Sequence, residues 1–120
     1  VKLENININK GEDKAISVGE KSKVDIKGIN ISNSKIGLAS KDNSNLKVKN
    51  IVINNIDIGA AAYIKKAEYG PATIKIEGIK ISNFRKKYIS QKKSEIIVNN
   101  IPIENYNCKN NKNDCYFLNN

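Results

Sequence analysis

Apolar and polar residues alternate along most of this chain in short blocks that recur at a nearly constant distance. Each block reads apolar–polar–apolar, then a polar or glycine position, then apolar–polar–apolar again. Complete copies begin at Val24, Leu46, Ile74 and Ile96, and a shortened copy begins at Val1. The spacings between copies are 23, 22, 28 and 22 residues. A fixed period of this length predicts a solenoid, in which equivalent residues of successive repeats stack on one another.

Within each copy, alternation with a period of two predicts short strands that have one buried face. The abundance of isoleucine and valine favours strands as well. Two strands in each copy are separated by a glycine or an asparagine, the residues that enter the left-handed region most readily, so we expect a sharp corner there. These corners are Asn5, Gly28, Asn50, Gly78 and Asn100. A second set of corners, whose amides can stack as ladders, is expected at Asn33, Asn55, Asn83 and Asn105.

A third apolar segment completes each repeat. These segments are residues 16–18, 36–40, 58–62, 88–90 and 116–118, and the last reads as the start of a further repeat. Three strands and three corners in about 22 residues make one coil of a parallel β-helix. We therefore predict an all-β fold, a parallel β-helix of about five coils over residues 1–120, with coils ~4.8 Å apart. An insertion at 63–71 and a polar loop at 107–115, flanked by cysteines, interrupt the pattern.

The outward-facing charges agree with this register. Lys2 stacks on Asp25, which stacks on Lys47, while Glu4 pairs with Lys27 and Lys49 with Glu77. Opposite charges that neighbour each other on one sheet face stabilise it by ~0.2–1 kcal/mol per pair.

The leucine-rich repeat is an alternative solenoid with a similar period. Ile26, Ile29 and Ile31 match its apolar positions, but Asn33 comes one residue too early and leucine is scarce. We therefore favour the β-helix. Pro102 lacks the N–H that an interior strand needs, so we expect the ladder to fray there or this strand to lie near an end.

The chain has no methionine and both begins and ends inside a repeat, so we expect it to be a piece of a longer protein. An open β-helix end exposes unpaired strand edges, and nothing in the sequence predicts a cap at either end. A partner chain or a second copy stacking on an open end is therefore one expected interaction.

The repeat pattern resembles the right-handed parallel β-helix proteins of the pectate-lyase-like superfamily. Three phrases are more specific: Ile16-Ser-Val-Gly-Glu-Lys-Ser22, Ile36-Gly-Leu-Ala-Ser-Lys-Asp-Asn-Ser44 and Tyr63-Ile-Lys-Lys-Ala-Glu-Tyr-Gly70. They are similar to β-helix segments of large bacterial surface and envelope proteins, some of which carry CotH-like kinase domains. The resemblance implies right-handed coils. It does not imply one activity, because this fold hosts lyases, hydrolases, epimerases, adhesins and inert spacers.

The chain has a formal charge of +9, from 21 basic and 12 acidic residues. This excess favours an acidic partner such as an anionic glycan. An AT-rich genome explains the same composition, because lysine, isoleucine and asparagine are abundant and Arg85 is the only arginine. Since arginine is the preferred residue for forked base and phosphate contacts, we expect no specific nucleic-acid recognition. No apolar stretch is long enough to predict a membrane span.

Two cysteines, Cys108 and Cys115, flank one polar loop. Their spacing does not match paired zinc ligands, and the chain has no histidine, so we predict no metal site and no cofactor. We therefore favour a disulfide between Cys108 and Cys115, which would indicate an oxidising compartment, with two free thiols as the alternative.

The insertion at 63–71 is the first candidate for a binding surface, because insertions on solenoid repeats often form the binding face. Tyrosine rings suit sugar faces, and lysines suit uronate or sulfate groups. The candidate ligand residues are Tyr63, Lys65, Lys66, Glu68 and Tyr69. A solvated corner with stacked ions is the plainer interpretation.

Catalysis is a second hypothesis. A glycoside hydrolase needs two carboxylates, one of them with a raised pKa, and a lyase resembling the pectate lyases would need a calcium site and a base. The only stacked acidic pair is Glu20 and Asp42, and Lys41 or Lys65 would have to act as the base. The lysine-rich surroundings favour ionisation of both carboxylates, which leaves no obvious acid. We therefore expect a non-catalytic β-helix module of a bacterial envelope or secreted protein, a rigid scaffold or a carbohydrate- or partner-binding surface. A fragment of a polysaccharide lyase, epimerase or glycoside hydrolase is the alternative.

Overall fold

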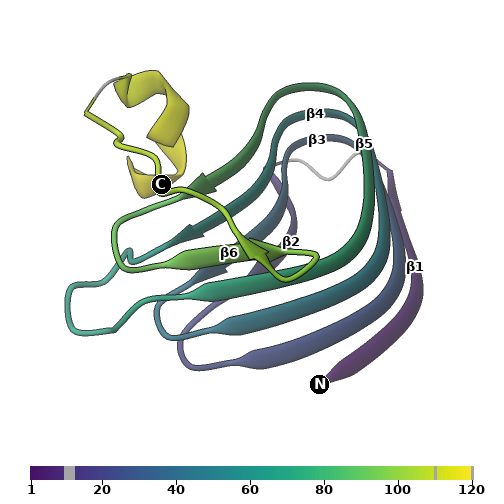
Figure 1. Cartoon of the computed structure of the whole chain (residues 1–120), viewed down its shortest axis with the longest axis horizontal. Coiled ribbons are helices and arrows are strands. Elements are labelled where there is room, and N and C mark those ends of the chain that lie inside the picture. Colours follow the sequence, from purple (N-terminus) through teal and green to yellow (C-terminus); the bar gives the residue numbers. More distant parts are fainter. Residues whose placement is uncertain (10–12, 110, 120) are drawn as a thin grey trace.

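The chain forms one curved sheet of seven strands, seen in the computed structural model of Figure 1, which describes residues 1–9, 13–109 and 111–119. The elements are β1 (Lys2–Asn9), β2 (Lys14–Val18), β3 (Lys23–Lys41), β4 (Asn45–Tyr63), β5 (Thr73–Ser90), β6 (Glu95–Val98), β7 (Ile101–Pro102) and the 3₁₀ helix η1 (Lys112–Asn119). The sheet order is β1-β3-β4-β5-β6-β7, and β2 also pairs with β3. All pairs are parallel except β6 with β7.

The register of the parallel strands matches the repeat in the sequence. Val24 of β3 pairs with Leu46 of β4, Leu46 pairs with Ile74 of β5, and Ile74 pairs with Ile96 of β6. Because each pair joins equivalent positions, like residues lie above one another on both faces of the sheet. The prediction of an all-β protein built on a parallel sheet is confirmed.

The long strands bend because residues in the left-handed region interrupt them. Gly28, Asn50 and Gly78 have φ values of 81°, 59° and 74°, and lie side by side in β3, β4 and β5. A second row of positive φ values comprises Asn33, Asn55 and Asn83. The amide of Asn55 donates to Asn33 at 2.6 Å, and that of Asn33 donates to Asn9 at 2.7 Å. The bond between Asn55 and Asn33 joins paired positions, whereas the bonds on either side are offset by one residue, because Asn9 pairs with Ser32 and Asn54, the acceptor for Asn83, pairs with Ser82.

The inward faces of β3, β4 and β5 form the main core, to which β2 and β6 also contribute. Its buried members include Ile26, Ile29, Ile31, Leu46, Val48, Ile51, Ile53, Ile74, Ile76 and Ile96, each exposed by 2% or less. Ile6 and Ile8 of β1 pack against this core and stay partly exposed, so the β1 side of the stack is not fully covered.

The last repeat departs from the prediction. Residues 101–103 were expected to stack as a parallel strand, but β7 turns back and pairs antiparallel with β6. Asn99 and Asn100, with φ values of 49° and 66°, form the two-residue turn. Two successive positive φ values are typical of the tight hairpin turns that reverse a strand. Asn105 is consequently no left-handed corner; its side-chain oxygen accepts a hydrogen bond from Ser90 at 2.8 Å.

The segment after β7 covers part of the end of the stack, where no cap was expected. The amide of Ile103 donates to the carbonyl of Ile96, and the amide of Tyr106 donates to that of Ser90. Ile103 packs against the main core between these two points. The prediction that both ends are uncapped is therefore wrong for the β6 end.

The outer face of residues 36–40, 58–63 and 89 is also apolar, and η1 covers it (Figure 1). Phe117 of η1 is fully buried there together with Ile36, Ile58 and Ile89. The prediction that residues 116–118 begin another strand is thus wrong, since they lie in a 3₁₀ helix that packs on the outside of the sheet. A disulfide joins Cys108 to Cys115 at the base of this segment.

Candidate functional site

In the first predicted binding surface, residues 63–71, the tyrosine at the start of the insertion is not accessible at the surface. Tyr63 is fully buried, and its ring centroid lies 4.6 Å from that of Phe117. Burial raises the pKa of the Tyr63 phenol to about 12. Tyr63 belongs to the packing beneath η1, so its proposed role as a surface for sugar rings is wrong.

The other candidate residues of this insertion do not converge on one point. Lys66 and Glu68 are exposed, whereas Lys65 and Tyr69 are partly buried. The ammonium group of Lys21 lies 5.9 Å from the centroid of the Tyr69 ring, a weak cation–π contact. These residues form a solvated corner rather than a concave site.

The proposed catalytic carboxylates hold this corner in place. Asp42 is fully buried, and its Oδ1 accepts the backbone N–H groups of Lys65 at 2.8 Å and Lys66 at 3.0 Å. Glu20 lies at the surface and pairs with the ammonium group of Lys66. The side chain of Lys41 runs beside Gly19, where an added Cβ would lie 3.0 Å from its Cε. Each carboxylate therefore serves the insertion loop, and the geometry does not favour an acid and a nucleophile facing a substrate.

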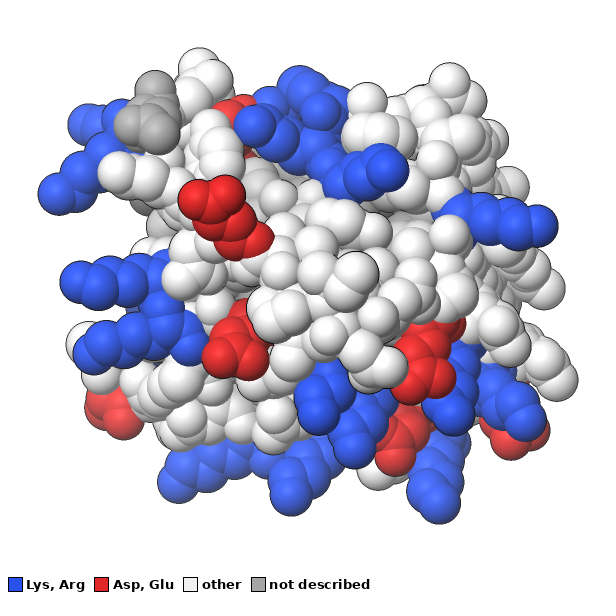
Figure 2. Space-filling view, viewed as in Figure 1, with Lys and Arg blue, Asp and Glu red and all other residues white. Residues whose placement is uncertain are grey.

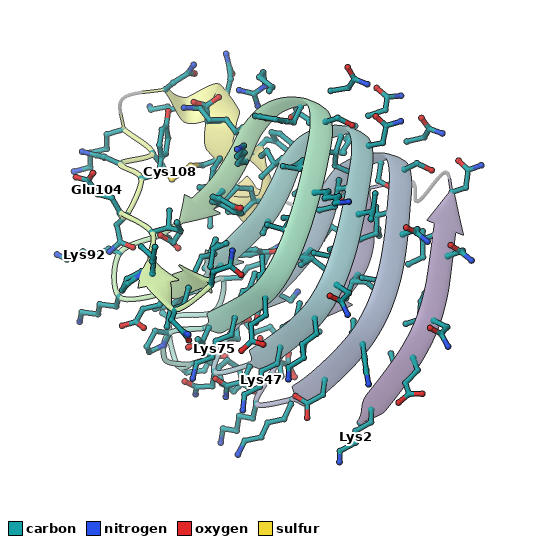
Figure 3. The ribbon with its side chains drawn as sticks, turned by 45° about the vertical axis from the view of Figure 1, so that its right-hand side comes forward. Lys2, Lys47, Lys75, Lys92, Glu104 and Cys108 are labelled. Atoms are coloured by element: carbon teal, nitrogen blue, oxygen red, sulfur yellow. A yellow bond between two sulfur atoms is a disulfide. The ribbon has the colours of Figure 1, made fainter. Side chains whose placement is uncertain are left out.

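A groove of about 550 Å³ crosses the outer face of the first segments of β1, β3, β4 and β5. Two rows of side chains run along it. One row contains Lys2, Asp25, Lys47 and Lys75, and the other contains Glu4, Lys27, Lys49 and Glu77. Figure 3 shows Lys2, Lys47 and Lys75 following one another along the same side of the sheet. The register of the strands thus places a charge on each successive strand, ~4.8 Å apart.

The charges of this groove are only partly neutralised. Lys49 and Glu77 approach to 3.7 Å, and among the described residues this is the one ion pair between two groove residues within 4 Å. All the charged side chains of the groove are exposed. Figure 2 shows basic and acidic side chains intermingled along the lower edge of the molecule. Sequence reasoning found these rows but interpreted them as stabilising pairs, because it could not show that they border a groove.

A second polar cluster attaches η1 to the sheet. Arg85 of β5 donates to both carboxylate oxygens of Asp57, at 2.6 and 3.1 Å, and also to Asp114 of η1. The hydroxyl of Tyr106 donates to Asp114, and that of Tyr116 donates to Asp57 at 2.9 Å. The repeat offset of 28 residues places Asp57 opposite Arg85, so this pair had a signal in the sequence that was not used, whereas no pattern in the sequence indicated the contact with Asp114.

This network shifts the titration of both carboxylates. The hydrogen bonds from Tyr106 and Arg85 hold the pKa of Asp114 below its ordinary value. The hydrogen bond from Arg85 and, to a smaller extent, that from Tyr116 do the same for the pKa of Asp57. Asp114 is nearly fully buried, and a buried carboxylate needs such partners to stay ionised. The ammonium group of Lys86, 3.9 Å from Asp114, supplies a second positive charge, so that two cations face the two carboxylates. The cluster is best explained as the attachment of η1.

No group of three or more metal-ligating side chains occurs among residues 1–9, 13–109 and 111–119. No helix in the same part of the chain has the length and apolar character needed to cross a bilayer. Comparison with family models, with curated proteins and with solved structures finds no match to this chain.

Proposed function

We propose that this chain is a segment of a right-handed parallel β-helix of the pectate-lyase-like kind. Three features support this. Equivalent residues pair at steps of 22 to 28 residues, as Val24, Leu46 and Ile74 do. Left-handed corners recur at equivalent positions of successive strands, and apolar columns fill the space that the bent strands surround.

On this architecture we propose a non-catalytic scaffold that binds an extended anionic partner, such as an acidic glycan, along the groove. The observation that carries the proposal is the excess of exposed lysines in the groove, five against three carboxylates, with two lysines side by side in each row. Lys47 and Lys75 pair across β4 and β5, and Lys27 adjoins Lys49 in the second row. A linear polyanion with regularly spaced charges can meet several of these ammonium groups at once, which raises affinity through many weak contacts.

The disulfide supports a site outside a reducing compartment. Disulfides persist in secreted and envelope proteins and are rare in the cytosol. The Cys108–Cys115 bond therefore agrees with a bacterial surface or secreted module. The alternative, a fragment of a lyase, epimerase or hydrolase, is less well supported because Asp42 is buried and already accepts two backbone hydrogen bonds.

Equilibrium binding to polyuronate, to a sulfated glycan and to a neutral glycan of equal length tests the proposal. We expect the two anionic polymers to bind, more weakly as salt rises, and the neutral one not to bind. Replacing Lys27, Lys47 and Lys75 with glutamine should weaken binding at least tenfold. The matched control replaces Lys35, Lys80 and Lys93, which are exposed and lie outside the groove. Equal losses in the two triple variants would show that only net charge matters and would refute the groove as the site.

A further inference from the structure

A second concave site lies at the other side of the molecule, beside the disulfide. It has a volume of about 450 Å³ and lies between the corner that follows β5 and the loop that precedes η1. Its walls are formed by Gln91, Lys92, Asn105, Tyr106, Asn107, Cys108 and Lys109. Figure 3 shows Lys92 and Cys108 on this side, away from the row of Lys2, Lys47 and Lys75. The proposed glycan groove shares no residue with this pocket.

The carboxamide oxygen of each of the pocket's three amide side chains already accepts a hydrogen bond within the protein. The Oε1 of Gln91 accepts the N–H of Ile64 at 3.2 Å. The Oδ1 of Asn105 accepts the hydroxyl of Ser90 at 2.8 Å. The Oδ1 of Asn107 accepts the N–H of Lys109 at 3.0 Å. These bonds fix the orientation of each amide and leave its NH2 group, which only donates, without a partner among the described residues.

The remaining polar groups of the pocket also donate. Lys92 and Lys109 belong to the walls, and their side chains are exposed, so two positive charges lie at this pocket. No carboxylate occurs among the described residues that form the walls; Glu104 precedes Asn105 in the chain but is not one of them. The hydroxyl of Tyr106 is engaged with Asp114, so its ring serves as an apolar wall. Among the described residues, the walls therefore carry three amide NH2 groups and two positive charges, with no carboxylate and no carboxamide oxygen that lacks a hydrogen bond.

We propose that this pocket binds a doubly charged oxyanion, a phosphate or sulfate group, either free or as part of a small molecule. The charge of such a group matches the two ammonium groups. Its oxygens also point in several directions, so they can accept hydrogen bonds from the corner at 91–92 and from the loop at 105–109 together. A carboxylate has two oxygens in one plane and can satisfy fewer of these donors.

Titration with inorganic phosphate and with sulfate, monitored by the side-chain amide signals in ¹⁵N NMR spectra, tests the proposal. We expect the NH2 signals of Gln91, Asn105 and Asn107 to shift with one common midpoint. Acetate at matched ionic strength should bind at least tenfold more weakly. Absence of these shifts with both dianions, or an equal midpoint with acetate, would overturn the proposal. Phosphate and sulfate midpoints then distinguish which group the pocket prefers.

Two pairs of variants separate specific contacts from charge. Asn107→Asp retains the oxygen that accepts from Lys109 but replaces the free donor with an acceptor, so affinity should fall at least tenfold. Asn7→Asp is the matched control, because the Oδ1 of Asn7 likewise accepts from Asn30, at 2.9 Å, on another strand. It should change affinity less than twofold. Replacing both Lys92 and Lys109 with glutamine should also lower affinity at least tenfold. Its matched control replaces Lys35 and Lys80 with glutamine. If either control variant lost as much affinity as the pocket variant it matches, the site would be refuted.

Discussion

The inner face of the sheet allows a test of how burial sets the cost of a substitution, because one column contains isoleucine on four successive strands at different degrees of burial. Ile6, Ile29, Ile51 and Ile79 pair in succession across β1, β3, β4 and β5. Ile29 and Ile51 are exposed by 2% and 1%, whereas Ile6 and Ile79 are only partly buried. The chemistry of an isoleucine-to-alanine change is constant along this column, so the burial of each position should decide its cost.

The expected magnitudes follow from cavity formation. Ile51 has an isoleucine neighbour on either side in its column, so Ile51→Ala leaves a closed cavity and should cost about 3–4 kcal/mol, within the range of about 2–5 kcal/mol for such changes in cores. Ile79 faces the partly covered end of the stack, where water replaces the missing side chain. Ile79→Ala should therefore cost about half as much. Val52→Ala, at a neighbouring position that is 45% exposed, should cost less than about 0.5 kcal/mol.

Urea unfolding followed by circular dichroism measures these differences. With a slope of about 1.5–2 kcal/mol/M, Ile51→Ala should lower the midpoint by about 2 M and Ile79→Ala by about 1 M. Equal costs for Ile51→Ala and Ile79→Ala would show that the β5 end is as well covered as the middle. A large cost for Val52→Ala would contradict the assignment of inner and outer faces.

Three further predictions concern the backbone and the attachment of η1. Gly59→Ala should destabilise the fold by about 1–3 kcal/mol in urea unfolding, because its Cβ would lie 2.5 Å from the carbonyl oxygen of Lys87; a neutral result would contradict this close backbone approach. Phe117→Ala should release η1, since its ring fills the space against Tyr63; faster hydrogen exchange in η1 with little change in β4 is expected, and unchanged protection would refute it. The attachment of η1 should also weaken in acid. The folded-state pKa of Asp114 lies below its unfolded value near 3.8, so the stability it contributes is present above that pH and is lost as the pH falls through the lower, folded value. If the protection of η1 against hydrogen exchange did not change as the pH falls below about 3.8, this prediction would be contradicted.

The strands and most corners could be predicted because they depend on local rules. A period of two sets the inner face, and glycine or asparagine marks the bends. The reversal at Asn99 and Asn100 had a signal that was missed, since two asparagines between apolar segments also favour a hairpin turn. Pro102 also indicated that the parallel stacking ends here, because it has no N–H to donate to an interior strand ladder.

The outer packing was harder to predict. Residues 60–63, Ala-Ala-Ala-Tyr, are apolar at every position, which indicates burial on both faces rather than alternation. Sequence reasoning used only the inner face and therefore placed Tyr63 at the surface. Asp57 lies opposite Arg85 at the repeat offset of 28 residues, so the repeat could have identified that pair. Asp114 lies outside the repeats, 29 residues after Arg85, and no local pattern identifies that contact. The pocket beside Cys108 depends on how the final loop returns to β5, which the repeat does not specify.

The insertion loop shows how this architecture tolerates changes in length. The offset between paired residues is 22 from β3 to β4 and 28 from β4 to β5, yet the rows on either side remain aligned. The six additional residues are accommodated between Tyr63 and Thr73 without displacing any pairing. Foreign peptides could therefore be displayed at this bend, whereas adding a single residue within a strand would turn every later side chain of that strand to the opposite face.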